Sequence, residues 1–381
     1  MIYLDNSATS FPKPNGVYDA YKKAIKYYHS NPGRGGYPNS LQSAEMVYET
    51  REKAAAFFGE DKEENVVFTA NCTQALNMVI KGLVKPGDHI LISDMEHNAV
   101  VRVLEKLRRQ SGIEYDAFCV DFYDDTKTLQ SLKRLIKPET KLVVCTHASN
   151  VFGTCLPLQK IGKICREHAI FLCVDAAQSG GILPLNMKTM HIDFLCIAPH
   201  KGLYAPMGTG MLIGDGSKLD TILEGGTGSD SFNYIQPDFM PDKLESGTLN
   251  VCGIVALGAG IDFIRDYGRN NIYQKDASHI VTLFDALKDT EGLQIYADYA
   301  RLKQFAPVFS FNIRHLPCEV VAQHLAQSGI CVRAGLHCAP LAHKKIGTHQ
   351  TGTIRISPSI FTTSKEINYT ISTIKKLAEN F

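Results

Sequence analysis

The chain has 381 residues, of which 44% are hydrophobic, so it is long enough to bury a substantial core and to form two subdomains. Its 40 basic and 39 acidic residues are mixed along the sequence and give a net charge of +1, which excludes a strong field that would attract nucleic acid or a membrane surface. The N-terminus lacks the pattern of a signal peptide and no segment reaches the roughly 18 apolar residues of a membrane span, so we expect a cytoplasmic protein.

Short β-rich runs alternate with helical stretches between about residues 65 and 215. The runs lie at residues 66–69, 89–93, 141–145, 170–174, 194–197 and 210–213. This rhythm predicts an α/β fold in which helices cover a mainly parallel sheet. Because such sheets bind ligands at the C-terminal ends of their strands, the polar residues that follow these runs are the candidates for a site.

A helical connection at about residues 252–290 leads to a C-terminal region of mixed character. Strand-like runs at residues 308–313, 330–333 and 353–356 alternate there with helices at about residues 317–328 and 364–379. Together with the N-terminal segment, this region is expected to form a smaller α+β domain. The predicted division is a large domain of residues 16–255 and a small domain of residues 1–15 and 256–381.

The sequence contains 11 cysteines, an odd number. They include no Cys-x-x-Cys pair and no zinc-like spacing with histidine, so no metal site is predicted. Most are expected to be reduced core residues, and Cys72, Cys145, Cys173 and Cys196 fit this interpretation because they lie in or beside apolar runs.

An aspartate and a lysine follow two of the predicted buried strands. Asp175 comes directly after residues 170–174, and Lys201 follows residues 194–197 in the pair His200-Lys201. Alone, Asp175 fits an N-cap of the next helix. Together, the two residues fit a pyridoxal cofactor, which needs a lysine amine to hold its aldehyde as a Schiff base and a carboxylate to keep its ring nitrogen protonated.

The turns after three other strands supply further candidates. Thr73 is predicted in a capping position at the helix after residues 66–69, where Cys72, hydroxyls and backbone N–H groups would surround the cofactor's phosphate. His97 either stacks on a pyridine ring or faces water at a helix start. Asn150 either caps a turn or donates a hydrogen bond to the ring hydroxyl.

Seven short segments, in chain order, carry a recognisable pattern. They are Asp5-Asn6-Ser7-Ala8-Thr9, Met95-Glu96-His97-Asn98, Ser149-Asn150-Val151-Phe152-Gly153, Asp175-Ala176-Ala177-Gln178, His200-Lys201, Glu245-Ser246-Gly247-Thr248-Leu249-Asn250 and Arg333-Ala334-Gly335-Leu336-His337-Cys338-Ala339-Pro340. They resemble the landmarks of cysteine desulfurases, which belong to the class V aminotransferases. The resemblance runs from residue 2 to about residue 363 and implies the PLP-dependent fold type I, with a mainly parallel seven-stranded sheet and a smaller α+β C-terminal domain.

The resemblance also implies a role for each residue around the cofactor ring. Lys201 would hold pyridoxal 5′-phosphate covalently and move protons in the reaction. Asp175 would pair with the pyridine nitrogen, Gln178 would lie near the ring hydroxyl, and His97 would stack on the ring.

At the phosphate, the resemblance implies contacts from Thr73 and His200, with Thr248 reaching across from the second subunit of a homodimer. Relatives commonly carry a serine where this chain has Ala198, which leaves that phosphate contact to another group. The glycine-rich loop at residues 225–229 either binds the phosphate through its backbone N–H groups instead or forms a flexible turn.

For the substrate, the resemblance implies that Arg355 binds the carboxylate, which its bidentate guanidinium suits. Asn150 would help to orient that carboxylate and the cofactor. Arg34 faces either the substrate at the site entrance or solvent in a surface loop.

Cys338 matches the nucleophile of type II desulfurases, which carry it on a short ordered segment. Outside that context it would be an inert buried thiol. Arg333, His337 and His343 are expected to act as positive neighbours that stabilise its thiolate. The implied reaction converts L-cysteine to L-alanine and transfers the sulfur to Cys338 as a persulfide, with a sulfur-acceptor protein or free sulfide as the next destination.

Other functions stay open at this level. A selenocysteine lyase acting on L-selenocysteine would use the same thiol and cofactor. Another class V aminotransferase or lyase would make Cys338 incidental. A non-catalytic sulfur-relay protein is disfavoured, because Lys201, Asp175, His97 and Cys338 occur together.

Overall fold

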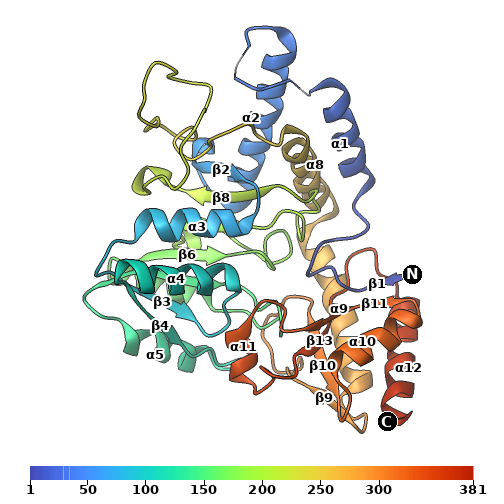
Figure 1. Ribbon diagram of the computed structural model, residues 1–381. Helices are drawn as coiled ribbons and strands as arrows, with labels where there is room; N and C mark the ends of the chain where they lie inside the picture. Colours follow the sequence, from blue (N-terminus) through green and yellow to red (C-terminus); the bar gives the residue numbers. More distant parts are fainter. Residues whose placement is uncertain (29, 34, 381) are drawn as a thin grey trace.

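The computed structural model describes residues 1–28, 30–33 and 35–380. Its largest sheet has seven strands in the order β2-β8-β7-β6-β5-β3-β4 (Figure 1). The strands are β2 (Val66–Thr69), β3 (His89–Ser93), β4 (Glu114–Phe118), β5 (Thr140–Thr146), β6 (Phe171–Asp175), β7 (Phe194–Ile197) and β8 (Gly210–Gly214). Only β8 pairs antiparallel, with β2 and β7, so the predicted mainly parallel seven-stranded sheet is confirmed.

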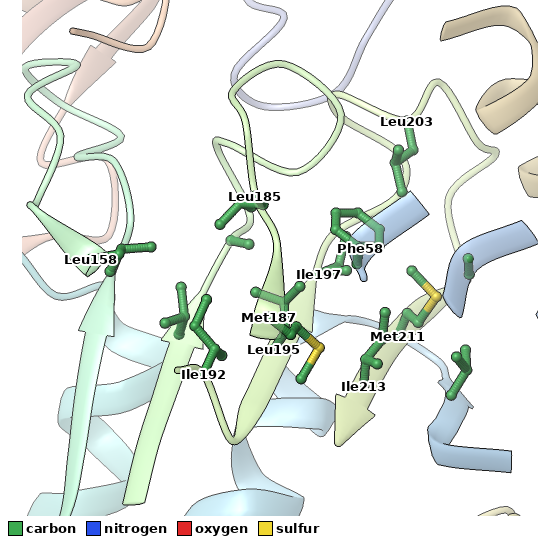
Figure 2. Packing of buried hydrophobic residues seen from close by; sticks show 14 of the residues in the cluster. Phe58, Leu158, Leu185, Met187, Ile192, Leu195, Ile197, Leu203, Met211 and Ile213 are labelled. Atoms are coloured by element: carbon green, nitrogen blue, oxygen red, sulfur yellow. The ribbon is translucent and has the colours of Figure 1, made fainter. Parts of the chain in front are cut away.

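The two faces of this sheet bury separate hydrophobic cores. In β3, Ile90 and Ile92 enter one core and Leu91 enters the other, as the two-residue period of a strand requires. The first core is covered by α3 (Cys72–Leu83) and α4 (Asn98–Ser111), which lie on the same side of the sheet (Figure 1). In the second core, Met211 of β8 packs near Phe58 at the end of α2 (Pro38–Phe58) (Figure 2). Because both faces are covered, the central strands are continuous apolar runs.

The remaining helices of this part surround the second core and the sheet edges. They are α1 (Asn15–Tyr27), α5 (Asp125–Leu135), α6 (Leu158–Glu167), α7 (Met187–Met190) and α8 (Val251–Tyr267), with 3-10 turns at Glu63–Asn65 and Gly216–Lys218. Helix α8 packs against both α1 and α2, which explains why it is apolar on nearly all sides. Within the described residues, no helix combines the length and the apolarity needed to cross a bilayer.

A smaller α+β part holds the third core. Its four-stranded antiparallel sheet has the order β12-β13-β10-β9, and β1 pairs with β11 separately. The elements are β1 (Ile2–Tyr3), α9 (Arg269–Leu287), β9 (Leu293–Ile295), β10 (Phe309–Ile313), α10 (Cys318–Gln327), β11 (Ile330–Cys331), β12 (Arg333–Gly335), α11 (Pro340–Lys345), β13 (Thr353–Ile356) and α12 (Ser364–Asn380). Leu4 joins the same core, and Figure 1 shows both termini in this part.

The predicted single strand at residues 330–333 is wrong. Residues 330 and 331 pair in parallel with β1, whereas Arg333 begins β12 and lies opposite Arg355 in β13. Each short segment therefore belongs to a different sheet. The consequence for the site is that the chain leaves β12 directly into the segment that carries Cys338.

Candidate active site

The predicted site residues of the large sheet lie at the C-terminal ends of its strands. Asp175 ends β6, and His97 and Asn150 follow β3 and β5. Lys201 follows β7 in a turn whose backbone is closed by its own N–H, which donates to the Ala198 carbonyl at 3.1 Å. Because these strands are parallel neighbours, their ends bring residues that are distant in sequence to one edge of the sheet.

A cavity of about 230 Å³ opens at this edge. It brings together eight of the predicted cofactor residues, Cys72, Thr73, His97, Asn150, Asp175, Gln178, His200 and Lys201. The other lining residues are Ala8, Asn71, Leu76, Met95, Ala99, Thr146, Ala177 and Ala198. Cys338, Arg355 and Thr248 do not line it, and Arg34 lies outside the described residues.

Asp175 and Lys201 provide the opposite charges of the cavity. The Asp175 side chain is 4% exposed, and its Oδ1 accepts hydrogen bonds from the Ala177 N–H at 2.9 Å and the Cys72 thiol at 3.7 Å. Burial lowers the pKa of Lys201 to about 8, and the positive charge of Arg355 acts in the same direction while Asp175 opposes it. Lys201 therefore has a larger neutral, nucleophilic fraction near neutral pH than an exposed lysine.

His97 caps helix α4 and also lines the cavity. Its Nδ1 accepts a hydrogen bond from the Ala99 N–H at 3.0 Å, which caps α4 and leaves the proton of the neutral ring on Nε2. Burial lowers its pKa, although the charge of Asp175 acts against this effect. The ring is thus held in one orientation and one tautomer at the cavity wall.

At the start of α3, the predicted capping role of Thr73 is wrong. Asn71 is the N-cap, because its side chain accepts the Gln74 N–H at 2.9 Å, and Thr73 is the second residue of the helix. His200 lines the same cavity, and burial lowers its pKa to about 4. Its buried Nδ1 has no partner among the described residues. This region therefore offers a hydroxyl, an imidazole and the N-terminal N–H groups of a helix.

The N-terminal segment closes one side of the site. The Ser7 carbonyl accepts a hydrogen bond from Gln178 Nε2 at 3.1 Å, and the hydroxyls of Thr9 and Ser10 both donate to the His200 carbonyl at 3.1 Å. Ala8 lies between them and lines the cavity. The motif at residues 5–9, to which the sequence assigns no role, therefore packs on the turn that carries Lys201.

Arg355 projects from β13 and is 2% exposed. Its guanidinium donates to Asp5 Oδ1 at 2.7 Å and to the Asn150 carbonyl at 3.1 Å, while its buried Nε has no partner among the described residues. Burial lowers its pKa and Asp5 counteracts this effect. Arg355 thus lies beside Asn150, with one donor group unused.

Cys338 is exposed and lies in a turn between β12 and α11. Its carbonyl accepts a hydrogen bond from the Asn98 N–H at 2.7 Å, directly after His97. One residue earlier, the His337 carbonyl accepts a hydrogen bond from Asn150 Nδ2 at 2.7 Å. Two hydrogen bonds therefore attach the Cys338 turn to the loops that carry His97 and Asn150.

The prediction that His337 and His343 act as positive neighbours of Cys338 is wrong. Both side chains are buried, and burial lowers the pKa of His337 to about 2 and that of His343 to about 4. The charge of Arg355 lowers the His337 value further. Both imidazoles are therefore neutral at physiological pH, because no carboxylate of the described residues compensates for their loss of water.

Thr248 is exposed and does not line the cavity. Its segment follows Glu245, and the N–H of Gly247 donates to the Gly226 carbonyl at 2.9 Å. Within the glycine-rich loop, the Thr227 and Ser229 hydroxyls bond to each other at 3.0 Å, and Ser229 donates to Asp242. The two segments form one exposed surface that lies outside the cavity.

Sequence reasoning missed Thr146 and Glu96. Thr146 is the last residue of β5, lies beside Asp175 in register and lines the cavity. Its N–H donates to Glu96 Oε1 at 2.8 Å. Thr146 directly follows the predicted β-rich run at residues 141–145, so its place at a strand end was sufficient to make it a candidate from the sequence.

The comparisons with known proteins identify the family of the chain. Residues 2–370 match the Aminotransferase class-V family. The chain is 33% identical to a probable cysteine desulfurase of Methanothermobacter thermautotrophicus, over 99% of this chain and 94% of the relative, and 30% identical to the cysteine desulfurase of Haloferax volcanii, over 100% and 90%.

Solved structures give the same result. The apo cysteine desulfurase of Thermococcus onnurineus NA1 superposes with a TM-score of 0.91 at 30% identity, covering 100% of this chain and 95% of the other. The cysteine desulfurase CsdA of Escherichia coli superposes with a TM-score of 0.88 at 26% identity, with the same coverage. The chain therefore belongs to the aminotransferase class-V family and, within it, to the cysteine desulfurases.

Proposed function

We propose that this chain converts L-cysteine to L-alanine with pyridoxal 5′-phosphate as cofactor and takes the sulfur onto Cys338 as a persulfide. The observation that carries the proposal is the attachment of an exposed cysteine to the rim of a cavity that holds a lysine and a carboxylate. Cys338 bonds to Asn98 through its backbone, and Lys201 and Asp175 line the cavity. Few reactions require a reactive amine and a thiol at one site.

The residues of the cavity fit the cofactor. Asp175 is a buried carboxylate that would hold a proton on the ring nitrogen, and Lys201 would hold the aldehyde carbon. Thr73 and the α3 N-terminus, with His200, would bind the phosphate, and the unused Nδ1 of His200 is one group that such a ligand would satisfy. Gln178 and His97 would contact the ring. When bound, pyridoxal phosphate would supply an electron sink for the bonds at the substrate's α-carbon.

Lys201 would move the protons of the reaction. Its lowered pKa, about 8, lets Nζ accept a proton from the substrate's α-carbon and return one to the product near neutral pH. A lysine with an ordinary pKa would be almost fully protonated under the same conditions. The burial that lowers the pKa of Lys201 would thus serve the catalysis.

Cys338 would be the nucleophile toward sulfur. Its Sγ would attack the substrate's sulfur, forming an S–S bond while the substrate's Cβ–S bond breaks and leaves its electron pair with the carbon skeleton. After protonation the skeleton leaves as alanine, so the products are alanine and one persulfide. An exposed position would let the outer sulfur pass to an acceptor protein or leave as sulfide.

Arg355 would bind the substrate's carboxylate. Its Nε is buried without a partner among the described residues, and a carboxylate would satisfy that donor together with one terminal nitrogen. Asn150 donates its side chain to the Cys338 turn and accepts from Arg355 through its backbone, so it would orient both. Arg34 at the entrance stays a prediction.

Four further predictions concern the whole protein. We propose a homodimer in which Thr248 reaches the neighbouring subunit's phosphate, for which its exposed position is suitable. Free cysteines persist most readily in a reducing compartment, so a cytoplasmic location is expected. The division into domains at residues 255 and 256, which falls inside α8, stays a prediction, as does turnover of L-selenocysteine.

The test replaces the proposed nucleophile. The Cys338→Ala protein should keep the visible absorbance of the bound cofactor and should lose sulfide release from L-cysteine by more than about 10³-fold, because the cofactor site does not contain the thiol. Mass spectrometry of the wild-type protein after one turnover should place one additional sulfur on Cys338.

Cys119 provides the matched control, because it is also exposed and free. Cys119→Ala should leave sulfide release within about twofold of the wild type. A Cys338→Ala protein with full activity would refute the assignment of the nucleophile. A wild-type protein that binds the cofactor but requires a keto acid as co-substrate would instead indicate an aminotransferase, and one without cofactor absorbance would indicate a non-catalytic role.

A further inference from the structure

The His337 side chain points away from solvent and toward strand β13. It is 4% exposed, and its Nε2 lies 3.0 Å from the Thr353 carbonyl oxygen and 3.2 Å from Thr353 Oγ1. A carbonyl only accepts hydrogen bonds, so Nε2 carries the proton of the neutral ring and donates it to Thr353. Thr353 begins the strand that holds Arg355.

The backbone of His337 and Cys338 has an unusual conformation. Both residues have positive φ angles, 48° and 58°, although each has a Cβ atom that disfavours the left-handed region. Such a turn persists only where surrounding contacts fix it. Here the Ala339 N–H closes the turn on the Leu336 carbonyl at 2.9 Å, and the remaining contacts come from other elements.

Three such contacts converge on the turn. The His337 ring holds it to β13, the His337 carbonyl accepts from Asn150 Nδ2 at 2.7 Å, and the Cys338 carbonyl accepts from the Asn98 N–H at 2.7 Å. Only the first uses a side chain of the turn itself. The other two depend on where the turn places its carbonyls, so removal of the imidazole would loosen all three.

We infer that His337 is a positioning residue that fixes the Sγ of Cys338 for attack, and that it takes no part in proton transfer. This inference rests on the proposed function, because it concerns the thiol assigned there as nucleophile. A displacement of about 1 Å at a reacting atom is enough to slow a reaction about 100-fold. His337 does not line the cavity, so its effect reaches the reaction only through the turn.

An acid–base role does not fit the same contacts. The ring's only proton is directed to Thr353, and Nδ1 is buried without a partner among the described residues. The neighbouring imidazole of His343, 5.7 Å away between ring centroids, is bonded through Nδ1 to Thr348 Oγ1 at 2.8 Å. The His337 ring therefore has no proton to exchange with Cys338.

The experiment compares His337→Ala and His337→Gln with His349→Ala in the holoenzyme. Gln places an amide N–H close to the position of imidazole Nε2, whereas Ala removes the donor. His349 is exposed in the same part of the chain and serves as the matched control. The rate of persulfide formation on Cys338 is measured in single turnovers with L-cysteine across pH, together with cofactor absorbance and the Kd for L-cysteine.

We expect His337→Ala to slow persulfide formation between about 10- and 100-fold, with cofactor absorbance and cysteine affinity within about twofold of the wild type. His337→Gln should recover most of the rate, and His349→Ala should match the wild type. The pH profile of every variant should keep its shape, because no titrating group is lost.

Two results would overturn the inference. One is a His337→Ala protein that forms the persulfide at the wild-type rate. The other is a Gln variant as slow as the Ala variant, with one limb of the pH profile missing in both, which would assign proton transfer to the imidazole. If His337→Ala does not fold, the rate and profile of the Gln variant decide by themselves. A wild-type protein that forms no persulfide counts against the proposed function and not against the role of His337.

Discussion

Glu96 lies between the ends of two strands beside the candidate site and is completely buried. Its Oε1 accepts hydrogen bonds from the Ser93 hydroxyl and the Thr146 N–H, whereas its Oε2 has no partner among the described residues. Burial raises the pKa of Glu96 to about 8, against the effect of these hydrogen bonds. Glu96 therefore links β3 to β5 as a neutral acid, one residue before His97.

This protonation has a testable effect on stability. The folded-state pKa exceeds the unfolded value of about 4.3, so the folded protein holds the proton more tightly and loses stability as pH rises from about 5 to 8. Glu96→Gln removes this dependence. Relative to the wild type, the variant should gain stability by up to about 1.4 kcal/mol per pH unit in that window, measured as the urea unfolding midpoint at each pH.

The exposed Glu139 provides the control. Glu139→Gln should leave the midpoint close to the wild-type value throughout, because the side chain is exposed to water. If the difference between Glu96→Gln and the wild type is also constant from pH 5 to 8, then Glu96 is ionised in the folded protein and the argument from burial is wrong.

At the scale of elements, a buried ion pair joins helix α2, strand β2 and the segment that carries Thr248. The Arg51 guanidinium donates to both Glu245 oxygens at 2.8 and 2.9 Å, and the pair is largely buried. Glu245 also accepts the Phe68 N–H at 2.6 Å, and the guanidinium lies 4.8 Å from the centre of the Phe68 ring. The segment after Glu245 is therefore fixed to the edge of the large sheet.

Replacing one partner of the Arg51–Glu245 pair should destabilise the protein much more than replacing both. Arg51→Met leaves the Glu245 carboxylate buried without its cation and should cost about 3–5 kcal/mol in the free energy of unfolding. The double variant Arg51→Met/Glu245→Gln should recover part of this loss, because no uncompensated charge remains. Urea unfolding of the four proteins in the cycle measures the coupling.

The exposed pair Lys85–Asp220 provides the comparison. Lys85→Met should change the unfolding free energy by less than about 1 kcal/mol, because water solvates the remaining aspartate. If Arg51→Met costs as little as Lys85→Met, the Arg51–Glu245 pair does not anchor the segment.

At the scale of the whole molecule, large apolar side chains are exposed in the loop that precedes Thr248 along the chain. Phe232 and Tyr234 are fully exposed there, and Ile235 is 76% exposed. Exposed apolar clusters of this kind are typical of interfaces with another chain. They support the proposed homodimer, in which Thr248 would complete the neighbouring subunit's phosphate site.

Mixed dimers test this arrangement. One protomer carries Thr248→Ala and the other carries Lys201→Ala, with different affinity tags for purification of the heterodimer. If Thr248 acts across the interface, the site with an intact Lys201 receives an intact Thr248 and should bind the cofactor with wild-type affinity. The Thr248→Ala homodimer should bind about tenfold more weakly, the effect of losing one hydrogen bond to a charged group.

Two outcomes would contradict a contact of Thr248 across the dimer interface. If the mixed dimer binds the cofactor as weakly as the Thr248→Ala homodimer, Thr248 contacts the phosphate of its own subunit. If the wild-type protein sediments as a monomer and still binds the cofactor tightly, the proposed dimer contact is wrong.

Several elements of the large sheet could be predicted residue by residue. Strands β2, β3 and β7 are short apolar runs buried on both faces, so their limits are visible in the sequence. Strand β4 was missed, because it lies at the sheet edge and its residues, from Glu114 to Phe118, are mostly polar or exposed. The limits of β11 and β12 depend on pairing with distant strands, which no local pattern encodes.

Most strands of the large sheet, the positions of Asp175, Lys201, His97 and Asn150 at strand ends, and the resemblance to a family could be predicted from the sequence alone, because apolar periodicity and strand-end motifs are local properties of the chain. Which of these groups come into contact could be established only from the folded structure. The attachment of Cys338 to Asn98, the pairing of Arg355 with Asp5 and the burial that neutralises His337 all join segments that are distant in the sequence. Hydrogen bonds and desolvation depend on the packed neighbours of a group, and those neighbours exist only in the folded chain.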